Sequence, residues 1–298
     1  MSHVQRTCLP SLCVLWGASM PAMAHSPTSG SAQEQIASML AVGLLGVFWL
    51  FYLAGSRRRQ AQVWRAMAFH AAMLLGFFAV AGPLDEWAET STTAHMVQHM
   101  LFMVVIAPLW VLSRPLKRLA AAGGKWVSRG WRPLLRLTRH PVLLAYLHGL
   151  TIWFWHMPRF YQLALDNSWW HVVEHGMFML TAGLFWWAVL YGRQRSVHWS
   201  LFALLLTLMH TGFLGALLTF AQAPLYGEAR SLQDQQLAGL IMWVPGALPY
   251  LLAAAWVGYR RFRTVHRGAL DSETAAGSLQ RAAKDPILWE SEERQGKL

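Results

Sequence analysis

The sequence predicts an all-α membrane protein, a bundle of seven transmembrane helices with its N-terminus outside and its C-terminus in the cytoplasm. Of the 298 residues 55% are hydrophobic and only 13% are charged, and the mean hydropathy is +0.30. This composition is typical of a chain whose solvent is the lipid bilayer. The 17 Trp fit the same class, because indole rings favour the interface between membrane and water.

The first 24 residues have the pattern of a cleaved signal peptide. Arg6 supplies a positive start, residues 9–18 form an apolar core that is too short to span a bilayer, and residues 22–24 read Ala-Met-Ala, a small-x-small cleavage site. We therefore expect residues 1–24 to be removed, which leaves the mature N-terminus outside.

Seven later stretches are long and apolar enough to form membrane-spanning helices of about 20 residues. They occupy residues 36–55, 63–82, 94–112, 141–157, 171–191, 199–221 and 237–258. The fourth is the shortest and contains His148 and His156. We expect a membrane domain over residues 25–260 and a flexible cytoplasmic tail over 261–298, which is polar and has no apolar period.

The positive charges orient the bundle. Lys and Arg concentrate in the segments that this topology places in the cytoplasm, whereas the outer loops contain only Arg159 and Arg230. This bias explains the net charge of +11 without a nucleic-acid partner. The expected partner of the apolar surface is the lipid bilayer. The basic loop 113–140 is either an amphipathic segment on the inner leaflet or a plain topology-setting loop.

Two prolines inside the predicted spans indicate irregular backbone. Pro108 and Pro245 each lack the N–H that an α-helix uses, so we expect a kink or local unwinding in the third and seventh spans.

The candidate functional residues are histidines at the outer ends of the spans. The third span begins His95-Met96-Val97-Gln98-His99 and the fifth begins His171-Val172-Val173-Glu174-His175; each places a Met, Met103 or Met179, four residues after its second His. Residues at i, i+4 and i+8 follow one stripe of a helix, so both His of a pair can reach one ion. Such residues also occur as packing groups, but two similar copies at one membrane depth favour a functional interior.

We therefore predict a metal site made by His95, His99, His171 and His175. His156 and Asp234 lie at outer ends of other spans and are the expected additional groups, with Asp234 orienting an imidazole, while Met103 and Met179 are expected as weaker ligands. Cys8 and Cys13 both lie in the signal peptide, so the mature chain has no thiolate. Imidazole with thioether favours copper, particularly Cu(I), over zinc, magnesium or calcium.

A zinc hydrolase is a weaker alternative. His171, Glu174 and His175 match the inverted zinc-peptidase motif, in which two His bind zinc and the Glu is the general base. The corresponding residue of the third span is Gln98, which cannot act as a base.

The chain resembles the multi-span CtaG-type (caa-type) cytochrome c oxidase assembly factors over residues 40–260. The resemblance rests on four motifs: His95-Met96-Val97-Gln98-His99-Met100, followed by Ala107-Pro108 and Arg114-Pro115; His156-Met157-Pro158 with Tyr161; His171 and His175 followed by Phe185-Trp186-Trp187; and DQQLAGLIMWVPG at 234–246. It implies a multi-pass protein of the bacterial inner membrane that helps to mature a haem-copper oxidase.

We combine these observations into one hypothesis. The protein is expected to hold copper and pass it from an extracytoplasmic donor to cytochrome c oxidase subunits, without being an enzyme. A haem-binding electron carrier, with His from facing spans as axial ligands, and a copper transporter remain the alternatives.

Overall fold

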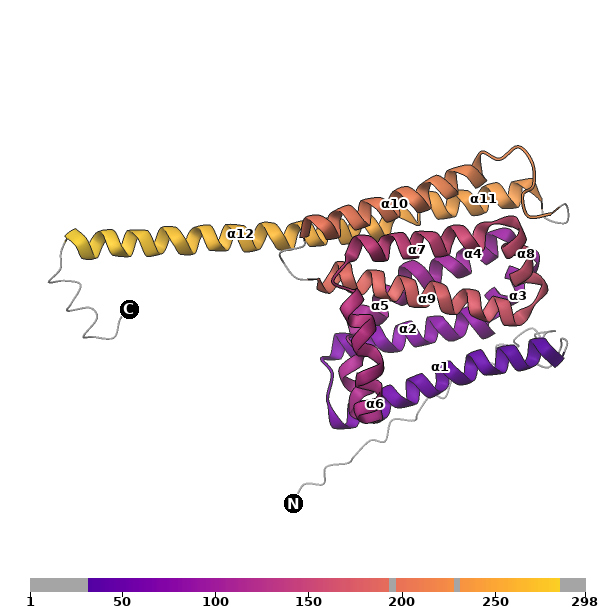
Figure 1. Ribbon diagram of the computed structural model, residues 1–298, viewed down its shortest axis with the longest axis horizontal. Helices are drawn as coiled ribbons and strands as arrows, with labels where there is room; N and C mark the ends of the chain where they lie inside the picture. The colour runs from indigo at the N-terminus through magenta and orange to yellow at the C-terminus, as the bar shows by residue number, and fades with distance from the viewer. Residues whose placement is uncertain (1–31, 193–196, 228–230, 285–298) are drawn as a thin grey trace, which may run out of the picture.

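The computed structural model describes residues 32–192, 197–227 and 231–284, and every regular element in these ranges is a helix (Figure 1). The signal peptide predicted for residues 1–24 lies outside them. The elements are α1 (Ala32–Arg58), α2 (Val63–Ala81), α3 (Pro83–Thr90), α4 (Thr92–Met100), η1 (Leu101–Ile106), α5 (Ala107–Ser113), α6 (Leu116–Leu137), α7 (Pro141–His156), α8 (Pro158–Asp166), α9 (Ser168–Tyr191), α10 (Val197–Thr219), α11 (Leu232–Trp243) and α12 (Ala247–Lys284).

Six helical segments of the described chain are long and apolar enough to cross a membrane, so the protein is a multi-pass membrane protein. They are Gln35–Arg58, Val63–Ala81, Thr92–Ser113, Ser168–Tyr191, Val197–Thr219 and Leu232–Gln280. These six correspond to six of the seven predicted spans. The remaining one is α7, a helix of 16 residues and about 24 Å, and its crossing of the bilayer stays a prediction.

The long helices lie side by side, and the short helices α3 and α8 lie at one end of the bundle (Figure 1). At one end lie α3 and α8 together with the first turns of α4, α9 and α11; we call it the histidine end. The segment formed by α4, η1 and α5 lies at the centre of the bundle, and we call it the central segment. Of its most apolar 18 residues 67% are buried, compared with 11% for α1. Large apolar side chains such as Leu150 and Leu252 point outward, as expected for a surface that contacts lipid.

Pro108 interrupts the α-helical hydrogen bonding of the central segment, as predicted. The six residues of η1 form a π-helix, and the N–H of Ala107 bonds to the carbonyl of Phe102, five residues back. Since Pro108 has no N–H, this register leaves the Met103 carbonyl free to accept 2.8 Å from the indole Nε1 of Trp186. The π-turn thus ties α9 to the central segment below the histidine pairs.

Pro245 likewise separates α11 from α12, which confirms the second predicted irregularity. α11 ends at Trp243, and the N–H of Gly246 reaches the carbonyl of Ile241, five residues back. A Cβ on Gly246 would overlap the backbone carbonyl oxygen of Met242, so only glycine fits in this turn.

The basic loop 113–140 folds as α6, which bends at Gly124, a residue with φ of +66°. Arg118 is buried against α1, and its backbone approaches Gly55 so closely that a Cβ there would overlap the Arg118 carbonyl. Trp126, in contrast, is 82% exposed. The loop was interpreted either as an amphipathic segment or as a plain connection, and its helical structure fits the amphipathic segment. Its contact with the membrane stays a prediction.

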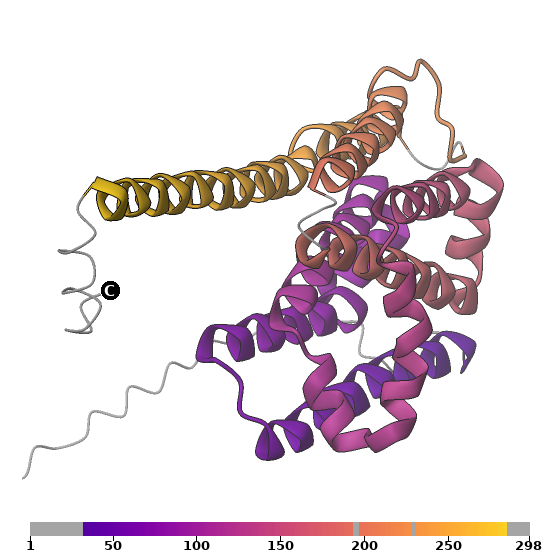
Figure 2. The ribbon, with the colours of Figure 1, turned by 60° about the vertical axis from the view of Figure 1, so that its left-hand side comes forward.

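The first part of the expected flexible tail, up to Lys284, is helical. α12 continues to Lys284 and leaves the bundle as a single projecting helix, which the turned view also shows (Figure 2). The outer part of α12 is exposed, but it extends a helix that is already nucleated inside the bundle, and propagation costs little once a helix exists. Residues 285–298 lie outside the described part of the chain.

Candidate metal centre

Two histidine pairs, one on α4 and one on α9, face each other at the histidine end. The ring centroids of His95 and His171 are 5.5 Å apart, and those of His99 and His175 are 5.6 Å apart. Within each helix the two rings of a pair are 4.2 Å apart, because residues at i and i+4 share one face. The structure thus brings together the four predicted imidazoles, while their binding of a metal stays a prediction.

Glu174 completes the cluster. Its Oε2 lies 3.5 Å from Nε2 of His99 and 3.9 Å from Nε2 of His95, and the side chain is fully buried. The carboxylate belongs to two groups, one with His95 and His99 and one with His171 and His175, and the potential ligand atoms of each group lie within 4.8 Å of one another. From sequence Glu174 was considered only as the base of a peptidase motif, although its i+3 position already placed it on the histidine face.

Several polar atoms of this cluster have no hydrogen-bond partner in the described structure. They are both ring nitrogens of His99, Nε2 of His171, Nε2 of His175 and both carboxylate oxygens of Glu174. Buried polar atoms are normally satisfied, because leaving one unpaired costs roughly 1–3 kcal/mol. A cation coordinated by the imidazoles and the carboxylate would satisfy these atoms, so the residues present fit a metal ion.

Met96 and His156 form a second feature beside the pairs. Nδ1 of His156 lies 2.7 Å from the Ile152 carbonyl, which can only accept, so Nδ1 carries the proton and Nε2 has the lone pair in the neutral ring. This Nε2 lies 3.2 Å from the sulfur of Met96, and the His156 ring lies 6.0 Å from that of His99. Two lone-pair donors that face each other without a proton between them suit a soft cation.

Met96 was not among the thioether ligands expected from sequence. Met103 packs in the core and its backbone accepts from Trp186, while Met179 lies against Phe102 and Ile106. The i+8 rule chose these two because it followed one straight stripe. The π-turn at η1 changes the register of the central segment after Met100. Met96 contacts His156, which lies on α7, a helix that the stripe did not include.

Asp234 has a different role from the one expected. Its Oδ1 accepts from Ser91 Oγ at 3.0 Å and from the N–H of Thr93 at 3.2 Å, while its Oδ2 accepts from the N–H of Thr92 at 2.5 Å. The first N–H groups of a helix lack partners within the helix and attract a carboxylate. Asp234 therefore fixes the start of α4, and through it the height of His95, instead of orienting an imidazole directly.

Gln98 breaks the symmetry between the two motifs. Its Nε2 donates to the Ala79 carbonyl at 2.6 Å and to Oδ1 of Asp85 at 2.7 Å, so it ties α4 to α2 and α3 while its counterpart Glu174 lies among the histidines. Burial raises the pKa of the Asp85 carboxyl to about 6, although the Gln98 hydrogen bond opposes the rise. The two motifs therefore share spacing but not function.

The model of a protein family described as cytochrome c oxidase caa3 assembly factor matches residues 46–264, which is well over half of the chain. The match confirms the resemblance inferred from the motifs, and it includes both histidine pairs, Glu174, Met96 and His156. No curated protein and no solved structure matches the chain.

Proposed function

Because the chain belongs to the cytochrome c oxidase caa3 assembly factor family, we propose that it holds copper at its histidine end and delivers it to the oxidase during assembly. Family membership supports the role in assembly and the oxidase as partner. That the protein binds copper and that it is not an enzyme are our own proposals beyond family membership.

The observation that carries this proposal is the convergence of two histidine pairs around the buried Glu174. The set contains imidazoles, one carboxylate and, at His156, a thioether, and it contains no thiolate. This donor set suits copper better than magnesium or calcium, and the thioether favours Cu(I). Glu174 belongs to both groups of potential ligands, which supports two adjacent positions for a copper ion. An ion that can move between two positions is easier to release to the oxidase.

The remaining parts of the proposal concern location and partners. The excess of Lys and Arg in the loops opposite the histidine end supports an extracytoplasmic site in the bacterial inner membrane, with the C-terminus in the cytoplasm. An extracytoplasmic copper donor then loads the site, and the oxidase subunits unload it.

The test replaces His95, His99, His171 and His175 by Ala together, with His198→Ala at the opposite end of the bundle as the matched control. In cells whose oxidase depends on this protein, we expect the quadruple variant to reach normal membrane levels, to bind no copper and to lose oxidase activity while the oxidase polypeptides are still made. Added copper should partly restore activity to single-His variants by mass action. Full oxidase activity of the quadruple variant at limiting copper would contradict the proposal.

The same preparations separate the rival functions. A Soret band in the purified protein would support the haem carrier, and copper uptake into sealed vesicles would support the transporter. We expect neither. Zinc-dependent peptidase activity that is lost in Glu174→Gln would support the hydrolase, and we expect none.

A further inference from the structure

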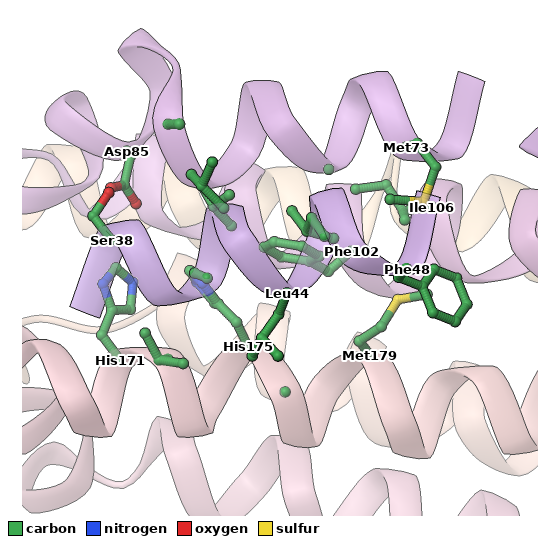
Figure 3. A pocket seen from close by; sticks show the side chains of 18 of the residues that line it. Ser38, Leu44, Phe48, Met73, Asp85, Phe102, Ile106, His171, His175 and Met179 are labelled. Atoms are coloured by element: carbon green, nitrogen blue, oxygen red, sulfur yellow. The ribbon is translucent and has the colours of Figure 1, made fainter. Parts of the chain in front are cut away.

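A groove of about 1170 Å³ lies between α1, α2 and α9, with α3 at one end (Figure 3). Most of its wall is apolar, with side chains such as Leu44, Phe48, Met73, Ile106 and Met179. Leu44 is 59% exposed, so the groove is open on the side that contacts lipid. Neither the histidine cluster nor the assembly role explains this apolar space.

The groove has room for an extended chain along α9. Gly176 and Gly183 both line it, and a Cβ added to either would meet nothing within 4 Å, although Gly183 itself is buried. Lining residues of α9 run from Ser168 to Trp187, 19 residues apart, which corresponds to about 28 Å of helix. This length matches a single isoprenoid or acyl chain.

The polar groups gather at one end of the groove. Ser38, Asp85 and His171 lie together there in Figure 3, and His175 follows one turn deeper. Nε2 of His171 and Nε2 of His175 are buried and have no hydrogen-bond partner in the described structure, and His175 is 9% exposed. These nitrogens and the Asp85 carboxyl offer hydrogen-bonding groups to the head of a bound molecule.

The charges at this end of the groove indicate which head group a bound molecule can have. Three carboxylates, those of Asp85, Glu86 and Glu89, line the groove, and its described lining residues include no Lys or Arg. A phosphate head would meet like charge without a partner. An uncharged head that carries hydroxyl groups would instead donate to the imidazoles and the carboxyl, while its chain fills the apolar part.

We propose that the groove binds a membrane-soluble quinol, with its ring hydroxyls at Asp85 and the α9 histidines and its chain along Gly176 and Gly183. The site overlaps the proposed copper site at His171 and His175, whereas its apolar part does not belong to that site. Metal-free protein is therefore the form in which binding is tested, and failure of one proposal leaves the other standing.

The test is a fluorescence titration of the full chain in nanodiscs, treated with chelator and titrated with a short-chain 1,4-benzoquinone. Trp110, Trp131 and Trp187 line the groove, so a bound quinone quenches part of the tryptophan emission in a saturable manner. The reduced quinol is then added as a competitor. Gly176→Leu and Gly183→Leu fill the groove, and Gly43→Leu is the matched control, since Gly43 lies on α1, is exposed and does not line the groove.

We expect weak but saturable quenching that the quinol reverses at lower concentration, because only the quinol can donate hydrogen bonds to the imidazoles and the carboxyl. The apparent affinity should be at least tenfold lower in both groove variants and unchanged in Gly43→Leu. Thermal unfolding of each variant shows that the protein remains folded, and leucine favours the helix over glycine. Quenching that rises linearly, or that is equal in all variants, would overturn the proposal because it reports partitioning into lipid. Equal competition by phosphatidylglycerol would also overturn it, since the groove would then be an ordinary phospholipid site.

Discussion

The carboxylate of Glu174 lies 3.5 Å from Nε2 of His99, so an acidic residue of α9 meets an imidazole of α4 in a fully buried site. This contact joins the two histidine pairs into one cluster. It makes Glu174 the residue whose removal distinguishes a metal site from aromatic packing.

The substitution Glu174→Gln retains the size of the side chain but removes its charge. If the carboxylate balances a bound cation, copper affinity falls by roughly 10- to 100-fold, the range that is typical when a group supporting a metal site is lost. Glu273→Gln, the same change on the exposed part of α12, is the matched control. Competition titration of the purified proteins measures both, and unchanged affinity in Glu174→Gln would rule out its role as a ligand.

Replacement of Met96 by Leu tests the thioether beside His156. Leucine is close to methionine in volume, so the core should tolerate the change. We expect weaker binding of Cu(I) and little change for Zn²⁺, because only the soft ion gains from sulfur. Met103→Leu and Met179→Leu serve as controls and should bind Cu(I) normally; if they lose as much affinity as Met96→Leu, the sulfur at His156 is not the ligand.

The N-terminus of α4 depends on Asp234, which bonds to Ser91, Thr92 and Thr93. Asp234→Ala should lower the free energy of unfolding by about 1 kcal/mol, the usual cost of losing a helix cap, and should weaken copper binding less than loss of a histidine. Asp271→Ala, on the exposed part of α12, is the control. Thermal unfolding and copper titration are the measurements, and normal stability of Asp234→Ala would show that the cap is dispensable.

Asp85 gives stability a dependence on pH. Burial raises the pKa of its carboxyl to about 6 from 3.8, so the folded state holds this proton more tightly than the unfolded state. The contribution is therefore fully present below about pH 4 and is lost as pH rises to about 6. Asp85→Asn, which can still accept from Gln98, should flatten the melting temperature between pH 4 and pH 6 relative to wild type. A parallel pH profile in the two proteins would contradict the shifted pKa.

The orientation and the crossing of α7 are tested by reporter fusions. Fusions at Arg58 and Arg129 should report the cytoplasm, and fusions at Glu89 and Asn167 should report the outside. The change of side between Arg129 and Asn167 requires that the 16-residue α7 spans the bilayer. The same side at both positions would show that it does not.

Much of the fold followed from composition and periodicity, because a helix that spans lipid must be long, apolar and hydrogen-bonded within itself. The breaks at Pro108 and Pro245 were predictable for the same reason, since each proline removes one donor. The helix from residue 261 to Lys284 was not, because most of its residues are polar; it continues the part of α12 that packs in the bundle.

The candidate site was predictable in its histidines and not in its other members. The i, i+4 spacing placed each pair on one face, and the repeat suggested that the faces meet. Spacing within one helix cannot show that Met96 touches a histidine of α7, that Gln98 turns to Asp85, or that Asp234 binds the end of α4. Those contacts depend on how the helices pack against one another.

X-ray absorption at the copper edge of purified protein loaded with one equivalent of Cu(I) tests the central claim most directly. We predict the multiple-scattering pattern of two or more imidazole ligands, which the Ala variants of His95, His99, His171 and His175 lose together and which His198→Ala retains. A copper spectrum without imidazole, or one unchanged in the quadruple variant, would show that the histidine cluster is not where copper binds.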